Sequence, residues 1–404
     1  MSKLRSLDDA LAELLGFAQV LPGVETLATF VADGRVLAQD LVAELQVPPQ
    51  DNSAMDGYAL RCADFLPHQA LPVSQRIPAG SPAQALVPNS VARIFTGAPL
   101  PTGADAVVQQ EDTQVLSDGR VQINRAPRPS QWIRRAGEDV PLHAVVLQRG
   151  VRLTPAALGL AASIGAATLS VRPRPRVALF STGNELVMPG TIAPAHMPLG
   201  AIYNSNRFFL HALLQRLGCV VSDLGIVPDR PDATLAALQN AAQSHDVILT
   251  SGGVSVGEED HIKAAVQSLG TLHLWQLAIK PGKPFAYGHV QGVHFMGLPG
   301  NPVSSFVTFL LLVRPFLLAL QGAENLPAQA LTLPAHFAWP KPDKRREFLR
   351  VRRNANGGLD LFANQSSGVL TSLVWADGVV DNPPGQTIQP GDAVSFLPWT
   401  QMLT

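Results

Sequence analysis

The sequence predicts a multidomain fold that combines one α/β domain with β-rich domains. Short alternating runs fill residues 48–140, strand and helix patterns alternate over residues 172–322, and β-type runs return from residue 323. We therefore expect an inserted β-rich domain, a central doubly wound α/β domain and a small C-terminal β-barrel.

The remaining segments, residues 1–47 and 141–171, are expected to form a discontinuous N-terminal domain. Apolar residues at helical spacing predict a helix over residues 7–20. A second helix is expected over residues 154–165, because threonine and proline suit its start and glycine suits its end. We expect this second helix to pack back against the N-terminal segment.

The two β-rich domains are bounded by residues 48–140 and 323–404. Turn residues separate their alternating runs, and four prolines mark the junction near residue 323. The clearest alternating runs are residues 90–95, 106–110, 120–124, 348–352 and 393–397.

The α/β domain, residues 172–322, follows a proline- and arginine-rich linker. Its expected helices are 206–217, 232–243, 260–269 and the apolar helix after Asn301-Pro302. Its expected strands are 177–180, 219–227, 246–250, 274–279 and 294–298. Three of these strands run directly into Ser181-Thr-Gly, Ser251-Gly-Gly and Leu298-Pro-Gly. The carboxyl ends of such strands form the ligand-binding edge of a doubly wound sheet, so we expect all three loops at one edge.

Composition excludes several classes of function. The chain has 404 residues, of which 46% are hydrophobic, and its 30 basic and 31 acidic residues give a net charge of -1. We therefore expect no nucleic-acid or membrane-surface partner. Cys62 and Cys219 are isolated, which argues against a disulfide framework or structural zinc and fits a reducing cytoplasm. The apolar run 306–320 contains Arg314 and Pro315 and is expected to be a buried core helix of a soluble protein.

Six segments combine glycine with residues that bind oxyanions or metals. A glycine allows backbone N–H groups to face an anion, and a neighbouring lysine, carboxylate or hydroxyl adds charge or ligands. Together they suggest a large, polyanionic ligand. The segments are Asp51-Asn-Ser-Ala-Met-Asp-Gly-Tyr58, Phe95-Thr-Gly-Ala-Pro99, Ser181-Thr-Gly-Asn-Glu185, Ser251-Gly-Gly-Val-Ser-Val-Gly257, Lys280-Pro-Gly-Lys-Pro284 and Leu298-Pro-Gly-Asn-Pro-Val303.

The segment from Ser251 to Asp260 predicts a phosphate cradle, because glycines and hydroxyls precede a helix N-terminus. It has neither the P-loop pattern nor GxGxxG spacing. Asp260 is either a helix cap or a Mg²⁺ ligand, and Asp229 follows a strand where it can supply a second carboxylate. The alternative is a flexible strand-to-helix turn.

The remaining loops also have two interpretations each. Lys280 and Lys283 flank a tight turn, so their ammonium groups either converge on one oxyanion or are solvated at the surface. Asn301 either caps a helix or binds a ligand. Asp56 precedes a glycine, which is also ordinary turn chemistry. Thr96 is a weak signal by itself.

These six segments, in this order, resemble those of the molybdopterin molybdenumtransferases, the MoeA type, which include the gephyrin E domain. The resemblance covers nearly the whole chain and implies an α/β domain of the molybdopterin-binding type. It implies an elongated homodimer of four-domain subunits in the cytoplasm, with an active site shared across the dimer. It also implies insertion of molybdate into adenylylated molybdopterin, with Mg²⁺ dependence and release of AMP.

The resemblance also assigns residues by position. The implied catalytic residues are Asp56, Thr96, Asp139, Glu185 and Asp260, and the implied metal ligands are Asp229 and Asp260. The residues expected to bind the pterin or the AMP phosphate are Asp51, Ser53, Ser181, Thr182, Gly183, Ser251, Gly252, Gly253, Ser255, Pro299, Gly300 and Asn301. The implied molybdate site consists of Lys280, Lys283, Pro284, Ser304, Arg345 and Ser367. The motifs around Arg345 and Ser367 match the family only loosely.

The sequence leaves two alternative functions open. A molybdopterin adenylyltransferase has a single domain that resembles residues 172–320, but the additional β-rich domains argue against it. A scaffold or interaction protein related to gephyrin is the other, although this chain lacks the extra domain and long linker of that relative. As an enzyme, the chain is expected to contact a molybdopterin adenylyltransferase and downstream cofactor-processing proteins transiently.

Overall fold

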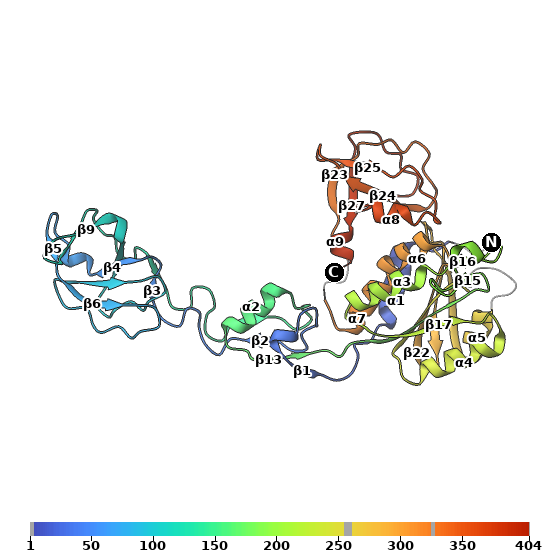
Figure 1. Cartoon of the computed structure of the whole chain (residues 1–404), viewed down its shortest axis with the longest axis horizontal. Helices are drawn as coiled ribbons and strands as arrows, with labels where there is room; N and C mark the ends of the chain where they lie inside the picture. Colours follow the sequence, from blue (N-terminus) through green and yellow to red (C-terminus); the bar gives the residue numbers. More distant parts are fainter. Residues whose placement is uncertain (1–3, 254–260, 325–327, 404) are drawn as a thin grey trace.

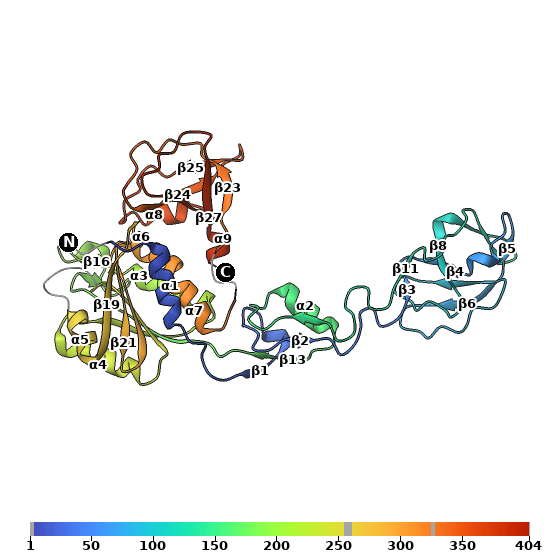
Figure 2. The same ribbon diagram turned by 180° about the vertical axis from the view of Figure 1, so that it is seen from behind.

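The computed structural model describes residues 4–253, 261–324 and 328–403. The molecule is elongated (Figure 1). The α/β domain and the C-terminal domain lie at one end, a small region around helix α2 lies in the middle, and a β-rich lobe lies at the other end. The same arrangement is seen from behind in Figure 2. We call residues 48–140 the distal lobe.

The α/β domain is built on a six-stranded sheet of order β17-β14-β18-β22-β21-β19. Strands β17, β14, β18 and β22 pair in parallel, and β21 runs antiparallel to both of its neighbours. The strands are Arg176–Thr182 (β14), Val220–Val227 (β17), Val247–Ser251 (β18), Gly270–Gln276 (β19), Pro284–Val290 (β21) and Val293–Leu298 (β22).

Helices cover both faces of this sheet because alternate strand residues point to opposite sides. Val177 and Leu179 join one core with helices α1, α3, α6 and α7, whereas Ala178 and Phe180 join a second core with α4 and α5. The helices are Leu7–Phe17 (α1), Asn206–Arg216 (α3), Pro231–Ala242 (α4), His261–Leu269 (α5), Pro302–Thr308 (α6) and Arg314–Leu320 (α7). The doubly wound arrangement is confirmed.

The expected strand 274–279 was wrong in extent. The chain forms β19 from residue 270 to 276, and after a break a short strand β20, Ile279–Lys280, pairs with the C-terminal sheet instead. Strand β21 was not predicted at all. Its segment follows the lysine turn so closely that no separate strand signal was apparent.

The helix 302–320 is the expected core helix. Within the described ranges it is long and apolar enough to cross a membrane, but 83% of its most apolar window is buried inside the protein. A π-helical turn, Phe309–Val313, separates α6 from α7. Pro315 at the start of α7 explains this turn, because proline cannot donate a hydrogen bond within a continuous α-helix.

The middle region joins two pieces of chain that are distant in sequence. Strand β1 (Glu25–Ala28) pairs with β13 (Thr168–Val171), and β2 (Leu41–Val42) pairs with β12 (Val145–Leu147). Helix α2 (Pro155–Ser163) starts at Thr154, whose hydroxyl accepts from the Ala157 amide at 3.3 Å. Ala157 shares a core with Ala32 and Leu37, which confirms that this helix packs against the N-terminal segment.

The distal lobe contains a four-stranded sheet of order β6-β7-β4-β8 and a three-stranded sheet of order β5-β10-β9. Strand β3 (Asn52–Ser53) pairs with β11 (Ile133–Arg134) beside them. The sheet strands are Gly57–Leu60 (β4), Ala70–Leu71 (β5), Val73–Ile77 (β6), Val91–Ile94 (β7), Ala106–Gln109 (β8), Thr113–Val115 (β9) and Val121–Ile123 (β10).

The C-terminal domain is a β-rich unit on one core that includes Leu349, Val380 and Phe396. Its sheet has the order β20-β24-β26-β27-β23, with β25 also pairing to β24. The strands are Leu331–Pro334 (β23), Arg346–Arg353 (β24), Leu359–Leu361 (β25), Gly378–Asn382 (β26) and Ala393–Pro398 (β27), and the short helices are Thr371–Trp375 (α8) and Trp399–Met402 (α9). The multidomain α/β plus β fold class is confirmed.

Candidate active site

A cavity of about 870 Å³ opens at the carboxyl ends of the parallel strands. Ser181, Ser251 and Leu298 are register partners in the neighbouring strands β14, β18 and β22. The hydroxyl groups of Ser181 and Ser251 lie 3.2 Å apart. The three glycine loops that follow these strands therefore meet at one edge, as the sequence predicted.

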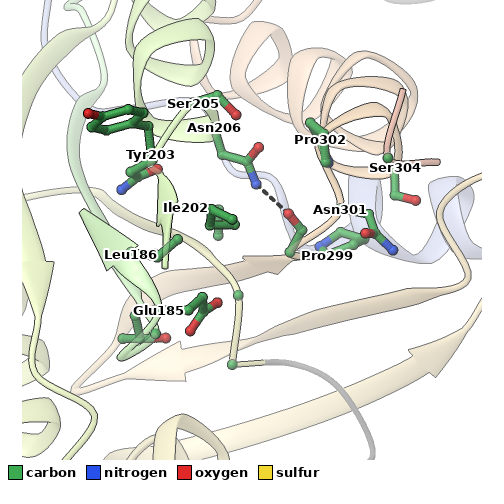
Figure 3. A pocket seen from close by; sticks show the side chains of 18 of the residues that line it. Glu185, Leu186, Ile202, Tyr203, Ser205, Asn206, Pro299, Asn301, Pro302 and Ser304 are labelled. Carbon is green, nitrogen blue, oxygen red and sulfur yellow. Dashed lines mark hydrogen bonds between the residues drawn. The ribbon is translucent and has the colours of Figure 1, made fainter. Parts of the chain in front are cut away.

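Most residues expected to bind the pterin or phosphate line this cavity. Those that do are Thr182, Gly183, Ser251, Gly252, Gly253, Pro299, Gly300 and Asn301, of which Pro299 and Asn301 are labelled in Figure 3. Asn301 occupies the N-cap position of α6, but no side-chain capping bond is found for it in the described part of the chain. Asn301 lines the cavity instead. Ser255 lies outside the described residues.

The glycine at residue 252 is required by close packing. Its φ is +92°, and a Cβ placed there would lie 2.8 Å from the Thr182 carbonyl oxygen. A side chain would force the two loops apart. The backbone of this loop can therefore approach a ligand at a distance that no other residue would permit.

Among the described residues, two carboxylates line the cavity. Glu185 follows the Gly183 turn, and Asp229 follows β17. Hard carboxylate oxygens are the ligands that Mg²⁺ prefers, so this donor set fits the implied metal. Asp260 lies outside the described residues. Within residues 4–253, 261–324 and 328–403, no group of three or more histidine, cysteine or acidic residues is arranged to hold a metal.

One wall of the cavity was missed by the sequence analysis. It comes from the end of β16 (Ile202–Tyr203) and the start of α3. The Asn206 side-chain amide donates to the Gly300 carbonyl at 2.7 Å, which ties this wall to the loop after β22 (Figure 3). The signal was the polar run Asn204-Ser-Asn206 directly before a helix. The residues of this wall that line the cavity are Ile202, Tyr203, Asn204, Ser205 and Asn206.

The lysine turn lies beside the cavity, but its two lysines differ. Pro284 and Ser304 line the cavity, as predicted. The Lys280 Nζ atom lies 3.2 Å from Glu347 Oε1 and 3.6 Å from Asp343 Oδ2, so its charge is already compensated by two carboxylates. Lys283 is exposed, and no ion pair is found for it among the described residues. The two lysines therefore differ: Lys280 is held in an ion-pair network, whereas Lys283 is open to solvent.

The C-terminal domain reaches the cavity through one loop. Gly368 and Leu370 line it, and the Val303 amide at the start of α6 donates to the Ser367 carbonyl at 3.0 Å. Arg345 does not line the cavity. Its guanidinium donates to both Asp343 oxygens, at 3.0 and 2.8 Å, and holds the pKa of that carboxyl well below its usual range.

A buried arginine behind this loop was also missed. Arg350 is 1% exposed and donates to the carbonyl groups of Phe348 and Ser366 and to the Ser372 hydroxyl, at 3.1 to 3.3 Å. No carboxylate partner is found for it in the part of the chain that the structure describes. Burial lowers its pKa to about 10, so it remains a cation at neutral pH. The alternating pattern of residues 348–352 gave no sign that Arg350 would be buried and bonded to the Ser366 carbonyl.

A second group of predicted residues lies in the distal lobe, at the opposite end of the molecule (Figure 1). Asp56 accepts hydrogen bonds from the Thr96 amide and hydroxyl, both at 2.8 Å, and these bonds lower its pKa. Asp51 accepts from the Ala136 amide at 2.9 Å and from Arg135, which lower its pKa in the same way.

The other two predicted residues of the lobe have simpler surroundings. Ser53 is buried and donates to the Met55 carbonyl at 2.6 Å. Asp139 is exposed, and its backbone amide donates to the Val47 carbonyl at 3.0 Å. A single chain therefore does not bring the distal-lobe residues to the cavity.

Comparison with known proteins identifies the family. The chain is 42% identical to the molybdopterin molybdenumtransferase of Haemophilus influenzae, over 98% of this chain and 99% of that protein. This chain belongs to the molybdopterin molybdenumtransferase family. Family models of the MoeA N-terminal region (domains I and II), a probable molybdopterin-binding domain and the MoeA C-terminal region (domain IV) match residues 5–165, 178–319 and 332–399.

Other members of the molybdopterin molybdenumtransferase family agree in length and fold. Molybdopterin molybdenumtransferase 2 of Mycobacterium tuberculosis is 39% identical over 87% of this chain and 89% of its own. A crystal structure of the molybdopterin biosynthesis MoeA protein from Pyrococcus horikoshii superposes with a TM-score of 0.84, at 28% identity over 98% of this chain and 100% of that one. Most residues that line the cavity lie within the segment matched by the molybdopterin-binding model, while Gly368 and Leu370 belong to the C-terminal match. The distal lobe lies within the N-terminal match.

Proposed function

We propose that this chain is a molybdopterin molybdenumtransferase that inserts molybdate into adenylylated molybdopterin and releases AMP, in molybdenum cofactor biosynthesis. The observation that carries the proposal is the glycine-lined cavity of about 870 Å³, whose lining comes mostly from the segment matched by the molybdopterin-binding model. It is large enough for an extended ligand and presents backbone amides at strand ends to its phosphates.

The chemistry of the transfer asks little of a protein nucleophile. Molybdate exchanges one oxo ligand, which leaves as water with the two thiol protons, for the two dithiolene sulfurs of the substrate. A water molecule cleaves the phosphoanhydride and AMP leaves. Charge on the phosphates must be stabilised as that bond breaks. The backbone of residues 251–253 and the amide of Asn301 bind and orient this part of the substrate.

Molybdate, a dianion, is the second substrate. Its proposed cation is exposed Lys283, which directly precedes the cavity-lining residue Pro284, and Ser304 of the cavity wall is a further proposed contact. Lys280 is shared with two carboxylates, and the buried cation Arg350 supports the Ser366–Gly368 loop from behind. With molybdate bound at Lys283 and Ser304, the glycine loops of the cavity are free to bind the adenylylated pterin.

Mg²⁺ dependence is part of the proposal. Asp229, together with Glu185 or Asp260, would hold the ion next to the phosphates. When bound, Mg²⁺ supplies Lewis-acid polarisation of the phosphoanhydride. The role of the chain is to place carboxylate oxygens at the mouth of the cavity.

We also propose that the working form is a cytoplasmic homodimer. Asp56 and Thr96 are joined by two hydrogen bonds in the distal lobe, yet the cavity of the same chain lies at the other end of the molecule. A second copy would bring its distal lobe to this cavity, so that each site uses two chains. Transient contact with the adenylyltransferase that makes the substrate follows from this assignment.

Reconstitution tests the proposal. Purified protein is incubated with adenylylated molybdopterin, Mg²⁺ and molybdate, and AMP release and active cofactor are measured. We expect both products to depend on molybdate. Incubation with ATP and unadenylylated molybdopterin should give no adenylate. Adenylate formation would instead support the adenylyltransferase alternative, and no reaction in either assay would support a scaffold role.

A further inference from the structure

Glu347 is a buried carboxylate in an unusual place. It stands on β24 of the C-terminal domain and is 1% exposed, at the point where β24 pairs with β20 of the α/β domain. Its register partner across that boundary is Lys280. Burying a carboxylate removes its hydration and costs free energy, unless hydrogen-bond donors and a cation compensate the charge.

Three donors from two domains compensate Glu347. Lys280 Nζ lies 3.2 Å from Oε1, and the Trp339 indole and the Asp343 amide donate to Oε2 at 2.7 and 3.2 Å. Among the described residues, Lys280 is the cation that pairs with it. The ammonium group is therefore fixed by a buried partner, while 41% of the Lys280 side chain remains exposed.

The lysine turn itself is rigid on the other side. Gly282 has a φ of +108°, and a Cβ there would lie 2.4 Å from the Thr308 hydroxyl on α6. The Lys283 carbonyl accepts from the Leu277 amide at 2.7 Å. The turn is thus set by packing and by this hydrogen bond, and the Lys280 ammonium is held by buried Glu347 at 3.2 Å and, at the longer distance of 3.6 Å, by Asp343.

We propose that Glu347 is the positioning residue of the oxyanion site, acting through Lys280. It holds the ammonium at a fixed point of the domain junction, so that an arriving tetrahedral oxyanion meets a cation already in place. This rests on the proposed function and extends it to a residue that never touches substrate. It also explains why a C-terminal strand pairs with the lysine turn.

The test uses Glu347→Asp, which keeps the charge and withdraws the carboxylate by one methylene. Because the charge is conserved, the long-range field on molybdate changes little, and the variant isolates the position of Lys280. We expect the molybdate concentration for half-maximal turnover to rise about tenfold. AMP affinity, measured by calorimetry, should stay within about twofold if the cavity is intact.

A double-mutant cycle makes the test specific. Lys280→Gln and Lys283→Gln are a matched pair on one turn. Of these two lysines, Lys280 is the one that contacts Glu347 in the described structure. The effect of Glu347→Asp should persist in the Lys283→Gln background and vanish in the Lys280→Gln background. Calorimetric titration with molybdate gives the same cycle where turnover is too slow to measure.

Two results would overturn the positioning role. One is an equal effect of Glu347→Asp in both lysine backgrounds, which would indicate general damage to the domain junction. The other is no effect in any background. Either result leaves molybdate-dependent turnover of the wild-type chain unchanged, so the proposed function is judged separately.

Discussion

The cavity and the distal lobe are both built from glycine-containing polar loops, but they organise their polar groups differently. In the distal lobe, Asp56 is already satisfied by two donors from Thr96, and Asp51 by Ala136 and Arg135. In the cavity, loops from three strands surround open space. The carboxylates of Asp51 and Asp56 already have hydrogen-bond partners within the lobe, whereas the cavity has room for a ligand. The difference supports a site that two chains complete together.

Subunit mixing tests this comparison most strongly. Asp56→Ala in the lobe and Asp229→Ala in the cavity should each lower turnover by on the order of 100-fold in pure dimers. In mixed dimers, one site combines an intact lobe with an intact cavity. With free subunit exchange, activity should recover to about a quarter of wild type. Turnover that stays at background, with exchange verified by differently tagged subunits, would show that a single chain holds the whole site.

A substitution at Gly252 tests whether ligand binding in the cavity depends on close approach of the backbone to the ligand. Gly252→Ala introduces a Cβ 2.8 Å from the Thr182 carbonyl at positive φ. Affinity for AMP should fall at least tenfold, with a loss of about 1–2 kcal/mol in unfolding free energy. Gly80→Ala is a matched control, because Gly80 has a φ of +80° and open space around it. Equal loss of AMP affinity in both variants would contradict the role of the cavity loop.

A substitution at Lys283 tests the proposed molybdate site beside the cavity. Losing one charge-assisted contact costs on the order of 1.5–3 kcal/mol, so Lys283→Ala should raise the molybdate requirement about tenfold to hundredfold. AMP affinity should change much less. Added salt should weaken molybdate binding more in wild type than in the variant, since screening acts on the charge that was removed. Calorimetry that finds weaker AMP binding with unchanged molybdate binding would reassign Lys283 to the phosphate.

The sequence predicted the cavity edge because Ser181, Ser251 and Leu298 each end a buried strand, and parallel strands bring such ends together. It could not predict the pairing of Lys280 with Glu347, because that contact depends on a two-residue strand that crosses into another domain. Arg350 was missed for a related reason. A buried arginine in a strand gives no periodic signal that distinguishes it from a surface one.

The local sequence was also insufficient to separate the two halves of the site. Asp56 and Asp229 were expected to belong to one constellation, and both have the turn and strand-end surroundings that the sequence indicated. The resemblance implied a site shared across a dimer, and in the structure one chain keeps the distal lobe and the cavity at opposite ends of the molecule (Figure 1). That arrangement follows from long-range packing and not from either motif.

The smallest expected effect concerns the prearranged acids of the lobe. The pKa of Asp51 is lowered, first by the Ala136 amide and then by Arg135, so the carboxylate stabilises the fold most above its ordinary pKa near 4. That stabilisation is lost as pH falls through the lower pKa of the folded state. Arg135→Gln removes only part of it. The pair is partly exposed, so the cost at neutral pH should be about 0.5 kcal/mol and should shrink with salt.

Chemical denaturation of wild type and Arg135→Gln between pH 2 and 7 would measure this difference. The gap in unfolding free energy should be constant above about pH 5 and should close toward pH 2. Asp51→Asn, which cannot ionise, should remove the pH-dependent part in both backgrounds. A gap that persists undiminished at low pH would mean that Arg135 acts through its bond to Ser130 or its packing. The lowered pKa of Asp51 would then be due to its bond from the Ala136 amide.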